Sequence, residues 1–198
     1  MKKYLAIVVT LFSSLLIYSS AHADENPTLS KDDTLTEVIL LPTIHRNHER
    51  SKTYSIEFLS SIIQKIKPDI VCSEITPESL QAYDAKKPAG RLNFFPEYTK
   101  SILPLRKELG YTVIPCSAYS KEVNFKTVGV KTMSKAHSKN IAKALDKIQG
   151  QGKKVLVTFG GGHISNILKN LTSRKDIKII DYRKTLTRLQ KDQFKAKP

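Results

Sequence analysis

The sequence has few cysteines and few acidic residues, and it has no long apolar run beyond its amino-terminal segment. Only two of its 198 residues are cysteine, Cys72 and Cys116. Neither of them directly follows the amino-terminal apolar run, which argues against a lipid anchor at that point. No later stretch is long and apolar enough for a membrane-spanning helix. These absences argue against a membrane-embedded or lipid-anchored mature protein.

The scarcity of acidic residues leaves a strongly basic chain, with 33 lysines and arginines against 18 aspartates and glutamates, a formal charge of +15. The positive charge is spread along the chain rather than gathered in one block. A diffuse field of this kind favours weak attraction to anionic membrane or polysaccharide surfaces. No motif combines aromatic and basic residues as nucleic-acid-binding motifs do, so we predict no nucleic-acid partner.

The first 23 residues have the pattern of a secretory signal peptide. Lys2 and Lys3 precede an apolar run from Leu5 to Tyr18, and Ala21-His22-Ala23 follows it. The run is too short to span a bilayer, and the Ala-x-Ala ending predicts cleavage after Ala23. We therefore predict a secreted or periplasmic protein, with a flexible polar leader over residues 24–36 and a single domain over residues 37–198.

Apolar runs of strand length alternate with segments of helical periodicity in that domain. Strands are predicted at 38–44, 69–75, 111–116, 155–159 and 177–181, helices at 51–67, from 77, at 93–109, at 134–149 and after the glycines at 160–162, and a loop at 117–131. Alternating strands and helices indicate an α/β fold with three layers and a mostly parallel, doubly wound sheet. We predict the strand order 3-2-1-4-5.

Three polar side chains stand where predicted strands end. His45 follows the first strand, Glu74 ends the second, and His163 follows the fourth. In a doubly wound sheet, ligands bind at the carboxyl ends of the strands where the strand order reverses, so we expect these residues to converge. Two imidazoles and a carboxylate suit Mn²⁺, Fe²⁺, Co²⁺ or Zn²⁺. Without a metal, a histidine and a glutamate could act as general base and acid.

Gly160, Gly161 and Gly162 separate the fourth strand from His163. Glycines let the backbone approach a ligand closely, and a helix start leaves N–H groups unpaired. This turn is therefore a candidate cofactor-binding element for an anion, a phosphate or a metal-bound oxygen, although a lone turn of this kind is also compatible with a solvated histidine.

These motifs resemble the TraB/GumN/PrgY and Tiki superfamily. The similarity spans about residues 37–171 and includes Leu41 to His45, Lys67 to Glu74, the pair Lys139-Asn140, and Val157 to His163. That superfamily has two Gly-x-x-His motifs, a glutamate after the second strand and an Arg-Asn pair. Characterised members include divalent-metal-dependent proteases, and related folds include erythromycin esterases and a haem-binding lipoprotein. The resemblance implies metal or catalytic roles for His45, Glu74 and His163, and catalytic roles for Lys139 and Asn140.

The sequence departs from the superfamily pattern at two positions. Pro42 stands where the first motif has glycine, and Lys139 stands where the pair has arginine. Lysine keeps the charge of arginine but loses its two-pronged geometry for holding a carboxylate or oxyanion.

Several other residues have open assignments. His48 either shares the site of His45 or is solvated, with solvation favoured, and His137 is expected at the surface. Arg46, next to the first motif, is a candidate replacement for the missing arginine, although adjacent side chains usually point apart. Cys72 and Cys116 end neighbouring strands and would pair in an oxidising compartment, although parallel neighbours rarely offer disulfide geometry.

Two functions of different classes follow from these patterns. The first is a metal-dependent hydrolase acting on a peptide, an ester or another small-molecule acyl substrate. The second is a non-catalytic periplasmic binding protein that uses the same crevice for a metal, haem or an anionic ligand.

Overall fold

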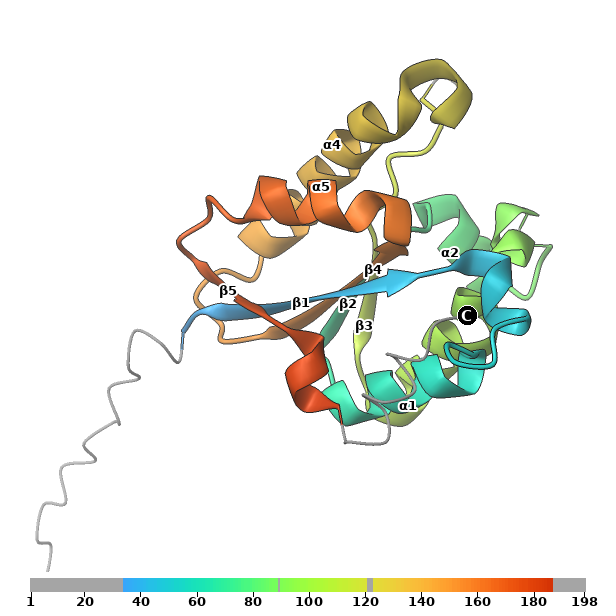
Figure 1. Cartoon of the computed structure of the whole chain (residues 1–198), viewed down its shortest axis with the longest axis horizontal. Helices are drawn as coiled ribbons and strands as arrows, with labels where there is room; N and C mark the ends of the chain where they lie inside the picture. Colours follow the sequence, from blue (N-terminus) through green and yellow to red (C-terminus); the bar gives the residue numbers. More distant parts are fainter. Residues whose placement is uncertain (1–33, 89, 121–122, 187–198) are drawn as a thin grey trace, which may run out of the picture.

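A computed structural model describes residues 34–88, 90–120 and 123–186 of the chain (Figure 1). The predicted signal peptide, most of the predicted leader and the end of the chain beyond Leu186 lie outside the described residues. The first strand begins at Thr36, the last residue of the predicted leader.

Five parallel strands form one sheet at the centre of the described chain (Figure 1). They are β1 (Thr36–Thr43), β2 (Ile70–Ser73), β3 (Thr112–Pro115), β4 (Lys154–Gly160) and β5 (Ile177–Ile180). Their order is β3-β2-β4-β1-β5. The predicted α/β class with a parallel sheet is confirmed.

The predicted strand order 3-2-1-4-5 is wrong in one exchange, because β4 and not β1 occupies the centre. A central strand is hydrogen-bonded on both edges and covered on both faces, so it reads as a continuous apolar run. β4 fits this position because its last six residues are all buried. The exchange keeps β1 and β4 as neighbours and places β2 beside β4.

Helices cover both faces of the sheet. They are α1 (Ile56–Ile66), α2 (Pro77–Asp84), α3 (Leu103–Leu109), α4 (Phe125–Asp146) and α5 (Gly161–Leu171), with shorter helical segments η1 (His45–Glu49), η2 (Gly90–Phe94), η3 (Tyr98–Ile102) and η4 (Tyr182–Thr185). No helix within the described residues is both long enough and apolar enough to cross a membrane.

Alternate residues of the strands build two cores. Ile39 and Leu41 of β1 pack on the face covered by α1, η3 and α3, whereas Val38 and Leu40 pack on the face covered by α4 and α5. In Figure 1, α4 and α5 lie together on one side of the sheet and α1 lies on the other. This arrangement is the three-layer architecture that the sequence predicts.

The segment from 117 to 131 differs from its prediction as a loop, because α4 begins at Phe125. Asn124 caps this start by accepting hydrogen bonds from the N–H groups of Lys126 and Thr127. Gly129 interrupts the helix with a φ of 69°, so α4 consists of two helical pieces joined at a kink. The second piece corresponds to the helix predicted at 134–149.

Candidate functional site

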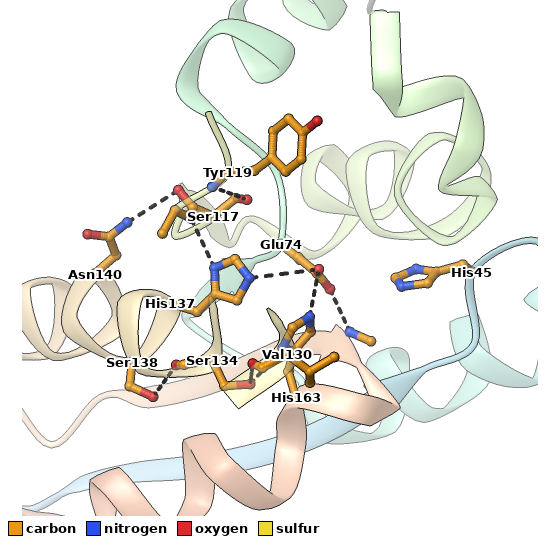
Figure 2. Close-up of polar contacts among 12 residues, drawn as sticks. His45, Glu74, Ser117, Tyr119, Val130, Ser134, His137, Ser138, Asn140 and His163 are labelled. Carbon is orange, nitrogen blue, oxygen red and sulfur yellow. Dashed lines mark hydrogen bonds and ion pairs between the residues drawn. The ribbon is translucent and has the colours of Figure 1, made fainter. Parts of the chain in front are cut away.

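The structure brings His45, Glu74 and His163 together at the carboxyl edge of the sheet, as the sequence predicts. Glu74 directly follows β2, His45 begins η1 just after β1, and His163 lies in the first turn of α5 just after β4. In Figure 2 the imidazole rings of His45, His137 and His163 are arranged around the Glu74 carboxylate. Glu74 and His163 are buried, whereas His45 is about one-third exposed, with 35% of its side-chain surface accessible.

Hydrogen bonds hold Glu74 both at one carboxylate oxygen and at its backbone N–H. Oε2 accepts a hydrogen bond of 2.6 Å from the Gly160 N–H. The Glu74 N–H donates to the Tyr98 hydroxyl, which in turn donates to the carbonyl of Thr158. Tyr98 is fully buried, and this desolvation raises the pKa of its phenol well above the usual value. Tyr98 therefore ties the end of β2 to β4 as a neutral hydroxyl and positions Glu74.

His163 presents one ring nitrogen to Glu74 and the other to α4. Its Nε2 lies 3.6 Å from Glu74 Oε1, and its Nδ1 lies 2.7 Å from the Ser134 hydroxyl oxygen. Ser134 donates its own hydroxyl proton to the carbonyl of Val130. Burial, assisted by the nearby His45, lowers the pKa of His163 and favours the neutral ring.

His45 is held by a buried carboxylate on the opposite side of its ring. Its Nδ1 lies 2.7 Å from Oε1 of Glu97, a residue with no exposed surface. The Glu97 Oε2 atom is buried with no hydrogen-bond partner among the residues that the structure describes. His45 adopts a φ of 52°, in the left-handed region that residues other than glycine rarely occupy. This strained conformation and the Glu97 contact together fix the direction of the imidazole.

Gly160 leaves room for His45 to approach Glu74. A Cβ atom built on Gly160 would lie 2.5 Å from His45 Nε2 and 3.3 Å from Glu74 Oε2. Both of these atoms therefore border the small space beside the Gly160 backbone. Gly161 and Gly162 are exposed at the start of α5, so their predicted contact with a cofactor stays a prediction.

His137 joins the site, which corrects its predicted surface position. It is only 1% exposed, and its Nε2 lies 4.0 Å from Glu74 Oε1. Its ring packs against those of Phe159 and His163. Burial, with a smaller contribution from His163, lowers the pKa of His137 to about 3, so its imidazole is neutral at physiological pH.

The side chains of Glu74, His137 and His163 each offer one potential ligand atom, and these atoms all lie within 4.8 Å of one another. Two atoms that share a zinc-like ion at about 2.0–2.2 Å each can be no more than about 4.4 Å apart. The 3.6 Å between Glu74 and His163 meets this limit. The contacts of the two histidines also suit a metal centre. Glu97 holds Nδ1 of His45 and Ser134 holds Nδ1 of His163, as the outer partners of metal-binding histidines do.

Two clefts open onto this edge of the sheet and share Ile44, His45 and Asn47. The larger, about 900 Å³, is here called the aromatic cleft, and its wall includes Glu74, Phe94, Phe95 and Tyr119 with Arg46 and Lys126. The smaller, about 370 Å³, follows the backbone from Gly160 to His163. The site therefore adjoins a partly apolar space that carries two cationic side chains.

The remaining candidates lie in varied surroundings. Lys139 is exposed on α4, and Asn140 donates a hydrogen bond to the carbonyl of Ser117, so their catalytic roles stay predictions. Arg46 lies over the ring of Phe94, 4.3 Å from its centroid. The two cysteines are free and buried; a hydrogen bond between Cys72 and Cys116, together with burial, raises the pKa of the Cys72 thiol well above its usual value.

His48 is buried, which corrects its preferred assignment as a solvated residue. Its Nε2 accepts a hydrogen bond from the Ile44 N–H, and its Nδ1 donates to the carbonyl of Tyr54. Both nitrogens are therefore used to shape η1, the helical segment that carries His45.

Sequence reasoning missed His137 and Glu97. His137 precedes Ile141 by four residues and therefore falls on the apolar face that Ile141, Ala144 and Leu145 define, so its burial could have been predicted from periodicity. Glu97 precedes the buried Leu105 by eight residues, within a segment predicted to be helical. That spacing alone does not reveal a partner across the chain.

Comparisons with family models, with curated proteins and with solved structures found no match.

Proposed function

We propose that this protein is an exported, metal-dependent hydrolase that uses Glu74, His163 and His45 to hold a divalent metal ion. The single observation that carries the proposal is the convergence of these three side chains: His163 Nε2 lies 3.6 Å from the buried Glu74 Oε1, and His45 Nε2 and Glu74 Oε2 border the same space beside Gly160. Mn²⁺, Fe²⁺, Co²⁺ and Zn²⁺ all accept such a mixture of imidazole and carboxylate ligands. The resemblance to the TraB/GumN/PrgY and Tiki superfamily supports the same assignment.

When bound, such an ion would polarise a substrate carbonyl and lower the pKa of a bound water. The chain's own residues orient and shield the reacting groups. Gly160 fixes one oxygen of Glu74, and Glu97 and Ser134 hold the imidazoles of His45 and His163. The aromatic cleft supplies apolar walls and the cations Arg46 and Lys126, which suits an acyl substrate with an apolar part and a negative charge.

One observation favours the alternative of a non-catalytic periplasmic protein that binds a metal, haem or an anionic ligand. Lys139 is exposed on α4, although the resemblance places it where family members have an arginine. A site without that cation still binds a metal but has less stabilisation for a developing oxyanion.

Metal titrations of the full protein test the proposal. We expect Mn²⁺, Co²⁺ or Zn²⁺ to bind at one ion per chain, and we expect the affinity to fall by more than about 100-fold in His163→Gln, since the loss of an outer partner alone costs about 10–100-fold. Ser165→Ala, an exposed position in the same helix, is the matched control.

Activity against a panel of esters and peptides separates the two functions. Hydrolysis that disappears with a chelator and returns with added Mn²⁺ or Co²⁺ supports the hydrolase. Metal binding without turnover across the panel supports the binding protein. Full metal occupancy in His163→Gln contradicts the proposed metal site, because the ion would then be held elsewhere in the protein.

A further inference from the structure

The hydrogen bond between Ala118 and His137 determines where the proton of this imidazole resides. The Ala118 N–H donates to His137 Nδ1 over 2.9 Å. A backbone N–H can only donate, so Nδ1 must carry a lone pair. In a neutral ring the single proton then lies on Nε2, the nitrogen that faces Glu74.

His163 has the opposite arrangement. The Ser134 hydroxyl proton is donated to the carbonyl of Val130, so the Ser134 oxygen accepts a hydrogen bond from His163 Nδ1–H. The lone pair of His163 is therefore on Nε2, 3.6 Å from Glu74 Oε1. Two neighbouring histidines thus point different groups at the same carboxylate, one a lone pair and the other an N–H.

This difference separates their functions. A metal ion binds an imidazole through the lone pair, so His163 Nε2 is available as a ligand whereas His137 Nε2 is not. Metal binding at His137 Nε2 would move its proton to Nδ1. The Nδ1–H group would then face the Ala118 N–H, with two donors 2.9 Å apart and no acceptor.

The His137 Nε2–H also needs an acceptor. This nitrogen is buried and has no hydrogen-bond partner among the described residues. Glu74 Oε1, at 4.0 Å, lies beyond hydrogen-bond distance. A buried donor that is left unsatisfied is costly, and an oxygen atom of a ligand placed beside Glu74 would remove that cost.

We propose that His137 is not a metal ligand but donates its Nε2–H to a carbonyl or carboxylate oxygen of the substrate held beside Glu74 and His163. This inference rests on the proposed function for the identity of the ligand. It gives His137 the role of a neutral electrophile, a fixed donor aimed at the oxygen on which negative charge develops.

Histidine ring spectra of the full protein test the assignment directly. With ¹⁵N-labelled histidine, long-range ¹H–¹⁵N spectra show which ring nitrogen is protonated, and ¹¹³Cd²⁺ splits the nitrogens that bind it. We expect a protonated, unsplit Nε2 for His137 and a split Nε2 for His163. Splitting at His137, or a protonated Nδ1 in its ring, would overturn the inference and leave the metal site standing.

A result with no split histidine would contradict the proposed function instead. In that case, the tautomer of His137 in the metal-free protein still shows whether its Nε2 carries the proton.

Binding of acetohydroxamate, a small carbonyl chelator, to the Zn²⁺-loaded protein tests the donor role. We expect about tenfold weaker binding in His137→Leu, the effect of one neutral hydrogen bond, with Zn²⁺ affinity nearly unchanged. Lys135→Leu, at an exposed position of the same helix, is the matched control. Equal acetohydroxamate affinity in the two variants contradicts the proposal. The spectra of the unmodified protein decide it if His137→Leu does not fold.

Discussion

At the scale of single residues, the missing side chain of Gly160 decides how closely His45 and Glu74 approach each other. A methyl group there would lie 2.5 Å from the end of the His45 ring, much closer than real contacts allow. The backbone φ of Gly160 is −51°, which any residue adopts, so the requirement for glycine is one of space. A Cβ atom built on Gly162, two residues later, would have no other atom within 4 Å.

We therefore expect Gly160→Ala to push the His45 imidazole away and to weaken metal binding about 10–100-fold, the range for changes that act through a neighbouring ligand. The unfolding temperature should change little, because the displaced group is the end of a partly exposed side chain. Calorimetric metal titration measures the affinity. Gly162→Ala is the matched control, and equal affinity in the two variants would show that His45 does not contribute to the site.

The residues that could be predicted from the sequence share one property. His45, Glu74 and His163 each follow an apolar strand, and parallel strands all end at one edge of the sheet. His137 and Glu97 reach the same place from helices, where a residue's position depends on how the helix packs. The tautomers of the histidines also depend on single contacts, such as the one with Ala118, that no sequence pattern records.

At the scale of elements, η1 is a short segment that buries a histidine in order to present another one. His48 uses one nitrogen to accept from Ile44 and the other to donate to Tyr54. The bond from Ile44 requires the lone pair of the neutral ring, because a protonated ring has no acceptor. Burial lowers the pKa of His48 from its usual value of 6.5. The hydrogen bond to Tyr54 and the charge of Glu97 oppose this shift and His45 adds to it, but burial is the largest effect.

Protonation of His48 is therefore expected to destabilise the fold. The unfolded chain takes up this proton as the pH falls below 6.5, whereas the folded chain resists it, so the free energy of unfolding decreases with falling pH. Urea unfolding of the metal-free protein at pH 7.5 and 5.5 measures the loss. His48→Gln should be less stable at pH 7.5 but should lose less on acidification, by at most about 1.4 kcal/mol per pH unit, the limit for one proton. An identical loss in both proteins would assign the pH dependence to other groups.

Helix α4 shows where element prediction from sequence fails. Its second piece has an apolar face with helical periodicity and could be predicted, whereas its first piece has only four residues before Gly129 and shows no periodicity. The first piece depends on the Asn124 cap, and Gly129 separates it from the second. Glycine normally signals a break, so a short segment that ends in glycine is typical of a loop.

At the scale of the whole molecule, the fold class follows from alternating strands and helices, but the order of strands does not. Both β1 and β4 are apolar enough to occupy the centre of a parallel sheet. The choice between them depends on whether β2 pairs with β1 or with β4. β2 and β4 are distant in the sequence. The two orders keep β1 beside β4, and so both bring His45 and His163 together.

Export is a prediction about the whole chain. In a secreting bacterial host, we expect the exported protein to have the mass of residues 24–198, because signal peptidase cleaves after small residues in an Ala-x-Ala pattern. Mass spectrometry of the intact protein checks this. Leu15→Arg, which places a charge in the apolar run, should prevent export and keep the full-length mass. An exported protein that retains Met1 to Ala23 would refute the prediction.

The position of β4 between β1 and β2 also has a consequence for how the chain acquires its structure. The described sheet pairs β1 only with β4 and β5, and β2 only with β3 and β4. During synthesis or translocation, the residues up to about 150 emerge before β4, which is the strand that joins β1 to β2. In such a nascent chain, both edges of β1 and the edge of β2 that later pairs with β4 are unpaired, and unpaired strand edges are sites for aggregation. The metal ligands would therefore assemble in one late step, when β4 inserts and brings α5 with it, and folding dominated by such distant contacts is slow.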